Sequence, residues 1–306
     1  MTAVRSFVSV LVTVFNREHI LAETLASILD SSFRHFEVVV VDDCSGDGSV
    51  SIARAVAVSD TRIQVHVNDQ NLGDYANRNR AASLAKGKYL KYLDADDLIY
   101  RHSLSTMVDV MERFPDAALA LSRNVIDPDE PYPRLYSPKE FFREHYFGKS
   151  PIGVGPSAAI IRRECFEAVG GFSGRQFVGD TELWMKLAER WPIVTLPPAL
   201  VWWRQHPGQQ MQLELKRPDI LNVRFQLELE SVASTGHLSD SLKEQAKARL
   251  SHSHARRLLA MATKGRNRRA AWRLFRNSGL TFGQLVSGIL KRRVNSDVPL
   301  AHEHFP

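Results

Sequence analysis

Three aspartates gather in the stretch YLKYLDADDLIY, which occupies residues 89–100. Asp94, Asp96 and Asp97 follow a run of bulky apolar and aromatic residues that is typical of a buried strand. Carboxylates this close together repel each other and lose hydration when they are partly buried. The cluster therefore needs a partner that makes it tolerable.

A divalent cation is one candidate for that partner. Asp94 and Asp96 lie two residues apart, so on an extended backbone both side chains point to the same side. Hard oxygen ligands at this spacing suit Mg²⁺ or Mn²⁺, which would cancel the repulsion and could bridge to a diphosphate. The alternative is a solvated acidic turn that caps a helix beginning at Arg101.

Polar residues also follow three other predicted strands. All four strand ends are short and rich in turn-forming residues: TVFNRE (13–18), DDCSGDGS (42–49), NDQNLGDYANRN (68–79) and DADD (94–97). Ligands bind at the carboxyl ends of the strands in open α/β sheets. We therefore expect these stretches to line one cleft.

Strand and helix patterns alternate along the first 125 residues. The predicted strands are 7–15, 36–43, 62–68, 88–97 and 117–123, with helical patterns between them. This order predicts an α/β protein with a doubly wound, mainly parallel, Rossmann-like sheet and helices on both faces. From about Lys216 the pattern becomes helical, which predicts an α/β domain at 1–215 and a basic helical C-terminal region at 216–306.

The composition excludes several classes of protein. Two cysteines, Cys44 and Cys165, exclude a disulfide framework and a CxxC metal pair. The apolar run at 7–15 is too short to span a bilayer and lacks a small-residue cleavage site, so the cytoplasm is the expected compartment. The chain also has no G-x-G-x-x-G after the first strand, no P-loop and no G-x-S-x-G elbow. The site must bind its ligand with carboxylates, amides and a few cations.

In its first two thirds the sequence resembles the family 2 glycosyltransferases, which have a nucleotide-diphospho-sugar-binding GT-A fold. The matching segments occur in the family's order within residues 6–210: VSVLVTVFNRE, VVVVDDCSGDGS, NLGDYANRNRAASLAKGKYLKYLDADD, GDTELWMKLAERW and WWRQH. The resemblance implies an inverting, metal-dependent transferase that moves a sugar from a nucleotide-diphospho-sugar to an acceptor hydroxyl. It also implies a nucleotide-binding half at about 1–125 and an acceptor half at about 126–215.

The resemblance assigns roles to residues of this sequence by position. The implied nucleotide-sugar-binding residues are Thr13, Phe15, Asn16, Glu18, Asp42, Asp43, Asn71, Gly73, Arg78, Asn79, Asp94 and Ala95. Arg78 can contact the base or the diphosphate through two parallel hydrogen bonds, or it can be a surface cation of its helix. Gly73 permits a positive φ or a close approach of the ligand. Asp43 has the alternative role of capping the turn in DCSGDG.

The family's metal-binding D-x-D motif corresponds to Asp94 and Asp96, and its late histidine corresponds to His206. The implied cofactor is Mn²⁺ or Mg²⁺, although His206 could instead stabilise its loop. The family's general base corresponds to Asp180, which could also be a helix N-cap. The family usually has Glu directly before this aspartate, whereas this chain has Gly179.

Basic residues are concentrated near the C-terminus. Residues 251–294 contain eleven Lys and Arg and no Asp or Glu. This segment could lie on an anionic membrane surface or pack on the catalytic domain as a solvated helical appendage. Nucleic acid is not expected as a partner, because no recognised binding module accompanies the charge. Membrane contact would place the enzyme peripherally at the inner face of the membrane and would suit a lipid-linked acceptor.

The sequence therefore predicts a glycosyltransferase of cell-surface polysaccharide or glycan biosynthesis, acting on a glycan or lipid-linked acceptor. One alternative is a sugar-1-phosphate nucleotidyltransferase, which should have a Gly-rich basic loop after the first strand, where TVFNRE stands instead. The other alternative is a non-catalytic protein that binds nucleotide sugars. The acids at Asp94, Asp96 and Asp180 argue against it.

Overall fold

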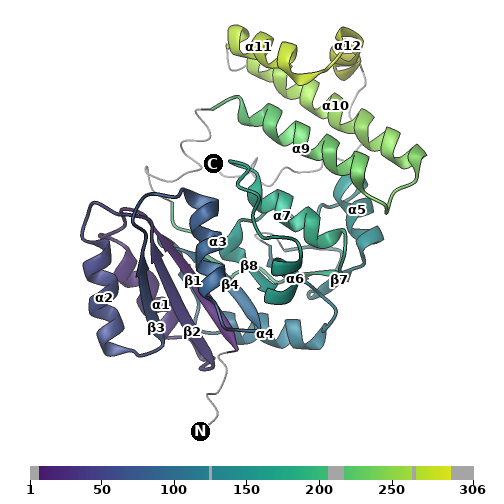
Figure 1. The fold of residues 1–306 in the computed structure, drawn as a ribbon. Coiled ribbons are helices and arrows are strands. Elements are labelled where there is room, and N and C mark those ends of the chain that lie inside the picture. Colours follow the sequence, from purple (N-terminus) through teal and green to yellow (C-terminus); the bar gives the residue numbers. More distant parts are fainter. Residues whose placement is uncertain (1–6, 124–125, 206–216, 264–266, 291–306) are drawn as a thin grey trace. The chain divides into compact units, whose positions relative to one another are not determined.

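The computed structural model describes residues 7–123, 126–205, 217–263 and 267–290. The chain divides into two compact units (Figure 1). The first unit is Met1–Pro138 with Pro151–Arg204, and the second is Lys139–Ser150 with Gln205–Pro306.

Four parallel strands form one half of the sheet in the first unit (Figure 1). They are β1 (Val8–Val14), β2 (Phe36–Asp42), β3 (Ile63–Val67) and β4 (Tyr89–Asp94). In the sheet they lie in the order β3-β2-β1-β4, so their carboxyl ends meet at one edge. β1, β2 and β4 form here because most of their residues are β-branched, aromatic or leucine and are almost completely buried, whereas β3 buries only Ile63.

The other half of the sheet is mixed. It consists of β8 (Ala159–Arg162), β6 (Leu119–Ser122), β9 (Ile193–Leu196) and β7 (Arg134–Tyr136). β8 runs antiparallel to both β4 and β6, β6 and β9 are parallel, and β7 is antiparallel to β9. The complete order is β3-β2-β1-β4-β8-β6-β9-β7, which confirms the prediction of an α/β protein with a mainly parallel sheet.

Helices cover both faces of this sheet. They are α1 (Leu21–Leu29), α2 (Ser49–Ser59), α3 (Asp74–Leu84), α4 (Ser103–Arg113), α6 (Arg163–Ala168) and α7 (Gly179–Ala188). Leu21, Leu25 and Ile28 of α1 share a core with the even-numbered valines of β1. α3 lies on the opposite face, where its Asn77 donates to the Val41 carbonyl and the Tyr92 hydroxyl donates to the Arg78 carbonyl.

A second, two-stranded sheet extends the first unit beyond the aspartates. β5 (Leu98–Ile99) pairs antiparallel with β10 (Val201–Trp202). Because of this pairing, Arg204 lies beside the turn that contains Asp96 and Asp97 and donates hydrogen bonds to both residues.

The second unit is helical (Figure 1). It contains α9 (Ile220–Ser234), α10 (Asp240–Thr263), α11 (Arg268–Ser278) and α12 (Phe282–Leu290), together with most of α5 (Pro138–Phe147). Its core consists of Phe225, Ala255, Leu258, Leu274 and Leu280. These helices confirm the predicted C-terminal helical region. Within the described part of the chain, no helix has both the length and the apolarity needed to cross a membrane.

The compact units divide differently from the boundary predicted near residue 215. The division falls after Arg204, and the segment 139–150 belongs to the second unit rather than to the acceptor half. The reason is a set of contacts from α5: His145 binds the Glu228 carboxylate at 2.9 Å, and Phe142 stacks on His237. Composition could not reveal contacts between segments so far apart in the chain.

Candidate active site

The three aspartates converge at the carboxyl end of β4. One carboxylate oxygen from each of Asp94, Asp96 and Asp97 lies within 4.8 Å of the other two. The strand ends at Asp94, and a turn follows in which the Asp97 amide donates to the Asp94 carbonyl at 2.9 Å. The acids are therefore gathered by this turn, not by the alternation of an extended strand that we expected. The turn also brings in Asp97, so that three carboxylates could serve as hard oxygen ligands.

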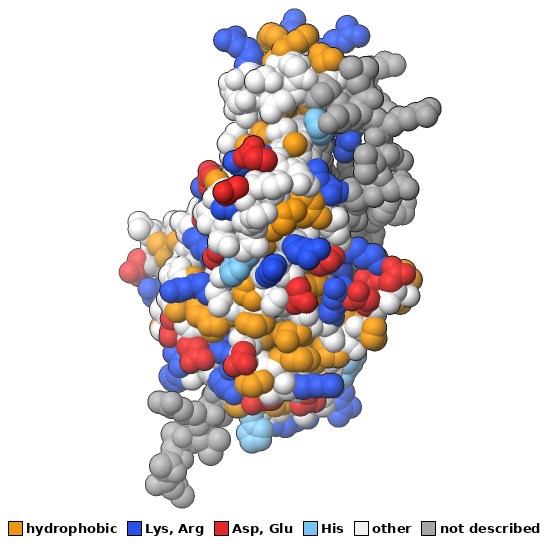
Figure 2. Space-filling view, turned by 90° about the vertical axis from the view of Figure 1, so that its right-hand side faces the viewer, with side chains coloured by type: hydrophobic (Ala, Val, Ile, Leu, Met, Phe, Trp, Pro, Cys, Tyr) orange, Lys and Arg blue, Asp and Glu red, His pale blue; other side chains and the backbone are white. Residues whose placement is uncertain are grey.

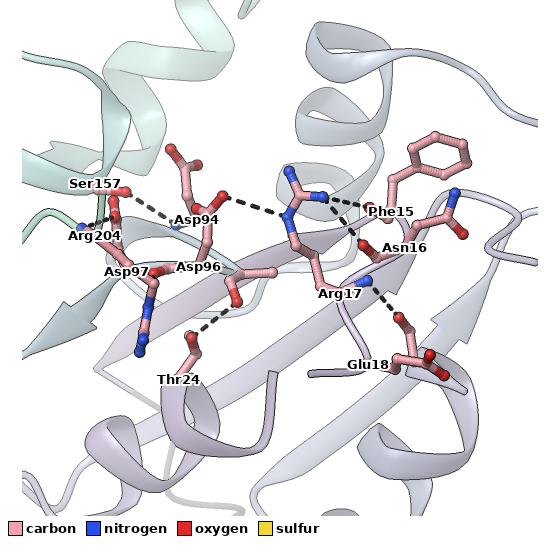
Figure 3. Close-up of polar contacts among 12 residues, drawn as sticks. Phe15, Asn16, Arg17, Glu18, Thr24, Asp94, Asp96, Asp97, Ser157 and Arg204 are labelled. Atoms are coloured by element: carbon pink, nitrogen blue, oxygen red, sulfur yellow. Dashed lines mark hydrogen bonds and ion pairs between the residues drawn. The ribbon is translucent and has the colours of Figure 1, made fainter. Parts of the chain in front are cut away.

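Two arginines face the outer acids of this cluster. Arg78 of α3 donates to Asp94 at 2.7 Å and to Asp74 at 2.8 Å. The Nε of Arg17 lies 3.3 Å from Asp96, and the same side chain donates to the main chain at the end of β1 (Figure 3). The structure thus places Arg78 beside the acid cluster. Arg17 also lies there, although it was not among the residues predicted from the sequence.

Arg78 is buried and one of its nitrogens lacks a partner. Its side chain is 8% exposed, and Nη1 makes no hydrogen bond. Burial works against the charged form, but Asp74 and Asp94 outweigh it and hold the pKa of the guanidinium above its ordinary value. A permanently charged donor with a free N–H beside the acid cluster is suited to bind an anionic ligand.

Asp97 is the most deeply buried acid of the three. Asp97 is 2% exposed, and its carboxylate accepts a hydrogen bond from the Arg204 amide at 3.2 Å. Burial, followed by the charge of Asp94, raises its pKa to about 7, although a hydrogen bond from Ser157 opposes the shift. Further positive charge near the cluster would therefore favour the ionised form.

A buried lysine lies beneath the aspartates. Lys91 of β4 is fully buried, and its ammonium donates to the Tyr92 carbonyl at 2.7 Å and to the Ser157 carbonyl. Burial lowers its pKa to about 7, while Asp97 and Asp94 act in the opposite direction. The sequence could have indicated this residue, because Lys91 stands in an otherwise apolar predicted strand. A lysine in such a position is rarely buried unless a charged residue lies nearby.

Arg204 fastens the aspartate turn to the rest of the unit. Its Nε donates to the Asp96 carbonyl at 3.0 Å, and its Nη2 donates to Glu23 of α1 at 2.6 Å. The sequence analysis selected His206 from the same segment as a metal ligand. His206 lies outside the residues that the structure describes, so that assignment stays a prediction.

The residues after β1 border the acid cluster on one side. Thr13 is paired in register with Asp94 across the β1–β4 ladder. Phe15 is 46% exposed, and Asn16 has a φ of 53°, a left-handed conformation that asparagine tolerates better than most residues. The bend at Asn16 ends the strand and leaves the Phe15 side chain accessible to a ligand.

Asn16 and Glu18 both hold the loop that leads into α2. Asn16 accepts a hydrogen bond from the Gly46 amide at 2.9 Å, and Glu18 accepts one from the Gly48 amide at 2.7 Å. These contacts bring the ends of β1 and β2 together, as the sequence analysis expected. They also show that the Glu18 carboxylate already has a main-chain partner.

The two acids after β2 have different partners. Asp42 accepts hydrogen bonds from the amide and hydroxyl of Ser45, so it is Asp42 that caps the turn in DCSGDG. Asp43 accepts hydrogen bonds from the Leu72 and Gly73 amides at 2.8 and 2.9 Å. The turn-capping role that we considered for Asp43 was therefore assigned to the wrong acid.

The loop after β3 is closed on Asp43. Asn71 donates to the Asp43 carbonyl at 3.2 Å, and Gly73 has a φ of 83°, so the expected positive φ is confirmed. Asn79 is turned elsewhere, because its side-chain amide pairs with both main-chain groups of Phe172. The structure thus places Asn71 and Gly73 beside Asp43, but gives Asn79 a partner in another loop.

Ala95 contributes its main chain to the turn. Its side chain is buried, and its carbonyl accepts a hydrogen bond from the Thr24 hydroxyl at 2.9 Å (Figure 3). The residue is only 4% exposed, and its assignment to the nucleotide-sugar site stays a prediction.

Asp180 lies in the first turn of α7. Its carboxylate accepts a hydrogen bond from the Thr181 amide at 2.6 Å, and the residue remains partly exposed. Burial, then the charges of Asp180 and Asp74, raise the pKa of the Tyr75 hydroxyl. Asp180 therefore lies close to α3, the helix that also carries Arg78.

Tyr75 also explains the glycine that precedes Asp180. The Gly179 amide donates to the Tyr75 hydroxyl at 3.1 Å, and a Cβ at position 179 would lie 2.7 Å from the Tyr75 ring. The glutamate that the family usually has here would collide with this ring. Tyr75 and Gly179 thus form a complementary pair that single positions in the sequence did not reveal.

The mainly parallel sheet brings an acid cluster and Arg78 together at its strand ends, where the resemblance to the family 2 glycosyltransferases implied a site. The model of "Glycosyl transferase family 2" matches residues 9–170, which is more than half of the chain. The chain therefore belongs to glycosyl transferase family 2, as the sequence analysis predicted.

Two relatives have related sequences. TuaG of Bacillus subtilis (strain 168), a glycosyltransferase named for teichuronic acid biosynthesis, is 35% identical over 111 residues, which are 36% of this chain and 44% of TuaG. Glycosyltransferase GlyG of Streptococcus pneumoniae serotype 4 (strain ATCC BAA-334 / TIGR4) is 26% identical over 223 residues, 68% of this chain and 73% of GlyG. The chain thus spans less than half the length of TuaG and about three quarters of GlyG.

Solved structures share the fold. TarS 1-349 of S. aureus in complex with UDP has a TM-score of 0.62 at 21% identity, covering 81% of this chain and 71% of that chain. The mannosyltransferase PcManGT of Pyrobaculum calidifontis, in complex with GDP-Man and Mn2+, has a TM-score of 0.61 at 21% identity, covering 94% and 81%. These similarities confirm the predicted GT-A fold.

Proposed function

We propose that this protein is an inverting, metal-dependent glycosyltransferase that transfers a sugar from a nucleotide-diphospho-sugar to an acceptor hydroxyl. The observation that carries the proposal is the convergence of Asp94, Asp96 and Asp97 within 4.8 Å beside the unpartnered Nη1 of Arg78. A site that offers carboxylates for a cation and a free guanidinium N–H for an anion suits a metal–diphosphate pair. The PcManGT structure contains such a pair, GDP-Man and Mn2+, in a protein of similar fold.

The acid cluster fits a hard divalent cation, Mn²⁺ or Mg²⁺, because its donors are carboxylate oxygens. Asp94 and Asp96 would hold it, with Asp97 as a third ligand and His206 as the predicted fourth. When bound, the ion supplies positive charge that stabilises the diphosphate leaving group. Arg17 and Arg78 already provide part of that charge, through ion pairs with Asp96 and Asp94.

Asp180 is the proposed general base. It would accept the proton of the acceptor hydroxyl while that oxygen attacks the anomeric carbon of the donor sugar. The bond from this carbon to the diphosphate oxygen breaks at the same time, and the electron pair leaves with the diphosphate. Attack opposite to the leaving group inverts the configuration. The side chain of Asp180 is suited to this role because it remains partly exposed.

The donor nucleotide would lie at the ends of β1, β2 and β3. Phe15 offers an exposed ring, and the main chain around Asn16 and Asp43 offers polar groups that could pair with the base and ribose. Because Asp43 and Glu18 already accept hydrogen bonds from main-chain amides, we propose that they shape these loops as well as contact the nucleotide. The TarS complexes with UDP and UDP-GlcNAc are consistent with such a donor class.

The proposed setting is cell-surface polysaccharide biosynthesis with a glycan or lipid-linked acceptor. TuaG, whose name refers to teichuronic acid biosynthesis, supports this assignment by similarity. A peripheral position at the inner face of the membrane would bring the site to a lipid-linked acceptor.

Transfer and donor hydrolysis with a panel of nucleotide sugars test the proposal, in the presence of Mn²⁺ and with a mixed glycan acceptor pool. The wild type should turn over one donor, and Asp180→Asn should bind the same donor with little turnover. Formation of a nucleotide sugar from a sugar 1-phosphate and a nucleoside triphosphate would favour the nucleotidyltransferase instead. Binding of the donor with no turnover by the wild type would favour the non-catalytic alternative.

A further inference from the structure

The outer face of α11 combines arginines with an exposed tryptophan. Trp272 is 58% exposed, while Ala271, Leu274 and Ser278 of the same helix are buried. Residues three and four apart are neighbours on a helix surface. Arg268, Arg269 and Arg276 therefore surround Trp272 on the face that points away from the core of the second unit.

A second aromatic side chain is exposed at the same end of this unit. Phe282, the first residue of α12, is 67% exposed, and a short turn with Gly279 in the left-handed conformation joins α11 to α12. Both helices pack on α10. Figure 2 shows hydrophobic side chains at this end of the unit with Lys and Arg side chains on both sides. We call the surface formed by Arg268, Arg269, Trp272, Arg276 and Phe282 the Trp272 surface.

The charge of the Trp272 surface is not neutralised by the acids that the structure describes around it. No ion pair joins Arg268, Arg269 or Arg276 to an acid among the described residues. The charge of Arg273 of α11 acts on Asp219, whose pKa is lowered mainly by hydrogen bonds from Arg217 and less by Arg273. Arg273 is for this reason excluded from the Trp272 surface.

We propose that the Trp272 surface docks on an anionic lipid bilayer. Tryptophan is an apolar ring with one polar N–H and is favoured at the level of the lipid headgroups. Arginines beside it would pair with lipid phosphates, and each basic residue near an anionic surface contributes about 1 kcal/mol. Burying two large exposed aromatic side chains supplies the apolar part of the binding. The absence of Asp and Glu between residues 251 and 294 makes the segment complementary to negative charge.

The proposal concerns the second unit alone and does not depend on glycosyl transfer. Its test is co-sedimentation of the full chain with vesicles of phosphatidylcholine, either pure or mixed with phosphatidylglycerol. The wild type should bind the mixed vesicles, and added salt should weaken the binding. The triple variant Arg268→Gln, Arg269→Gln, Arg276→Gln should bind on the order of a hundredfold more weakly, which follows from about 1 kcal/mol for each arginine.

A matched triple variant separates this surface from general charge. Arg54, Arg80 and Arg101 are exposed arginines of the first unit, and their replacement by Gln removes the same charge. The control should bind the mixed vesicles like the wild type. Equal losses in the two triple variants would overturn the proposal, and so would equal binding of the wild type to pure phosphatidylcholine.

Quenching by brominated acyl chains locates the contact. Trp272 belongs to the second unit, whereas the other four tryptophans, Trp184, Trp191, Trp202 and Trp203, belong to the first. Brominated mixed vesicles should quench part of the emission, and Trp272→Phe should abolish that part while leaving much of the binding. Quenching that survives in Trp272→Phe contradicts the proposal, as does preferential binding of a nucleic acid duplex over mixed vesicles at equal salt.

Discussion

The two compact units bury polar side chains in opposite ways. The first unit buries charges: Arg78, Lys91 and Asp97 are all at most 6% exposed and lie around one turn. In the core of the second unit the polar network is neutral: His254 binds Asn222 at 2.9 Å and Asn222 donates to the Leu274 carbonyl, while the Glu228 carboxylate that contacts His145 is partly exposed. Its arginines on α11 face outward.

Buried charges are costly, and a pair of them seldom stabilises a fold as well as apolar packing would. The second unit shows that this chain can fill a core with neutral hydrogen bonds. The charges of the first unit are therefore better explained by a ligand than by folding. The unpartnered Nη1 of Arg78 supports that interpretation, because a buried donor without an acceptor costs free energy.

The largest effect is expected from Asp180→Asn, which removes the proposed base while keeping the shape of the side chain. Transfer should fall by about a hundredfold to ten-thousandfold, the usual contribution of general base catalysis. Donor affinity should change little, because Asp180 is assigned to the acceptor. Initial rates at saturating donor, with exposed Asp116→Asn as the matched control, measure this effect. Transfer at the wild-type rate would contradict the assignment.

The neutral network of the second unit predicts a loss of stability in acid. Burial, and then the charge of Arg257, lowers the pKa of His254 from 6.5 to about 4. The unfolded chain therefore binds more protons than the folded one between these values, so stability is complete above pH 6.5 and falls towards pH 4. The total loss is about 3 kcal/mol.

Thermal unfolding followed across this pH range checks the prediction for His254. In His254→Gln the part of the pH dependence that belongs to this unit should disappear, since no imidazole remains to take up a proton. An unchanged pH profile in the variant would show that His254 is not the titrating group.

Arg78→Gln and Lys88→Gln compare how much a buried and an exposed ion pair contribute to stability. The first substitution leaves Asp74 and Asp94 without their cation, so it should lower the free energy of unfolding by about 2 kcal/mol. This value is smaller than that for a fully buried ion pair, because both acids are about one third exposed and solvent screens them. Lys88→Gln removes an exposed pair with Glu112 and should cost less than about 1 kcal/mol. Urea denaturation of both variants provides the measurement, and similar losses in the two would argue against a special role for burial.

The smallest effect is expected from Lys91→Met. Removing the buried ammonium makes the site more negative, so Mn²⁺ should bind about threefold to tenfold more tightly. The apo protein should also lose some stability, because the Tyr92 and Ser157 carbonyls lose their donor. Isothermal titration with Mn²⁺ distinguishes this outcome from weaker binding, which would indicate that Lys91 mainly holds the turn in place.

Much of the fold could be predicted from local patterns. The strands β1, β2 and β4 are nearly continuous apolar runs, whereas β3 alternates apolar and polar residues and buries only Ile63. The polar residues that follow these strands must meet at one edge because parallel strands end together. The acids at the end of β4 and the positive φ of Gly73 followed from the same local signals, whereas the turn that gathers the three carboxylates did not.

Contacts between distant segments could not be predicted in this way. Arg204 reaches Asp96 across more than a hundred residues, and Tyr75 reaches Gly179 across a similar distance. The pairing of His145 with Glu228 assigns 139–150 to the second unit for the same reason. Such contacts depend on the tertiary arrangement, which hydrophobic periodicity and turn signals do not report.

The central claim is that the aspartate cluster binds a divalent cation together with the diphosphate of the donor. Calorimetric titration of the wild type and Asp96→Asn with UDP and with GDP, each with and without Mn²⁺, tests it most directly. We predict that the wild type binds one of these nucleotides tightly in the presence of Mn²⁺, and that omission of Mn²⁺ or the Asp96→Asn substitution abolishes this binding. Equal binding with and without Mn²⁺, or undiminished Mn²⁺-dependent binding in Asp96→Asn, would contradict it.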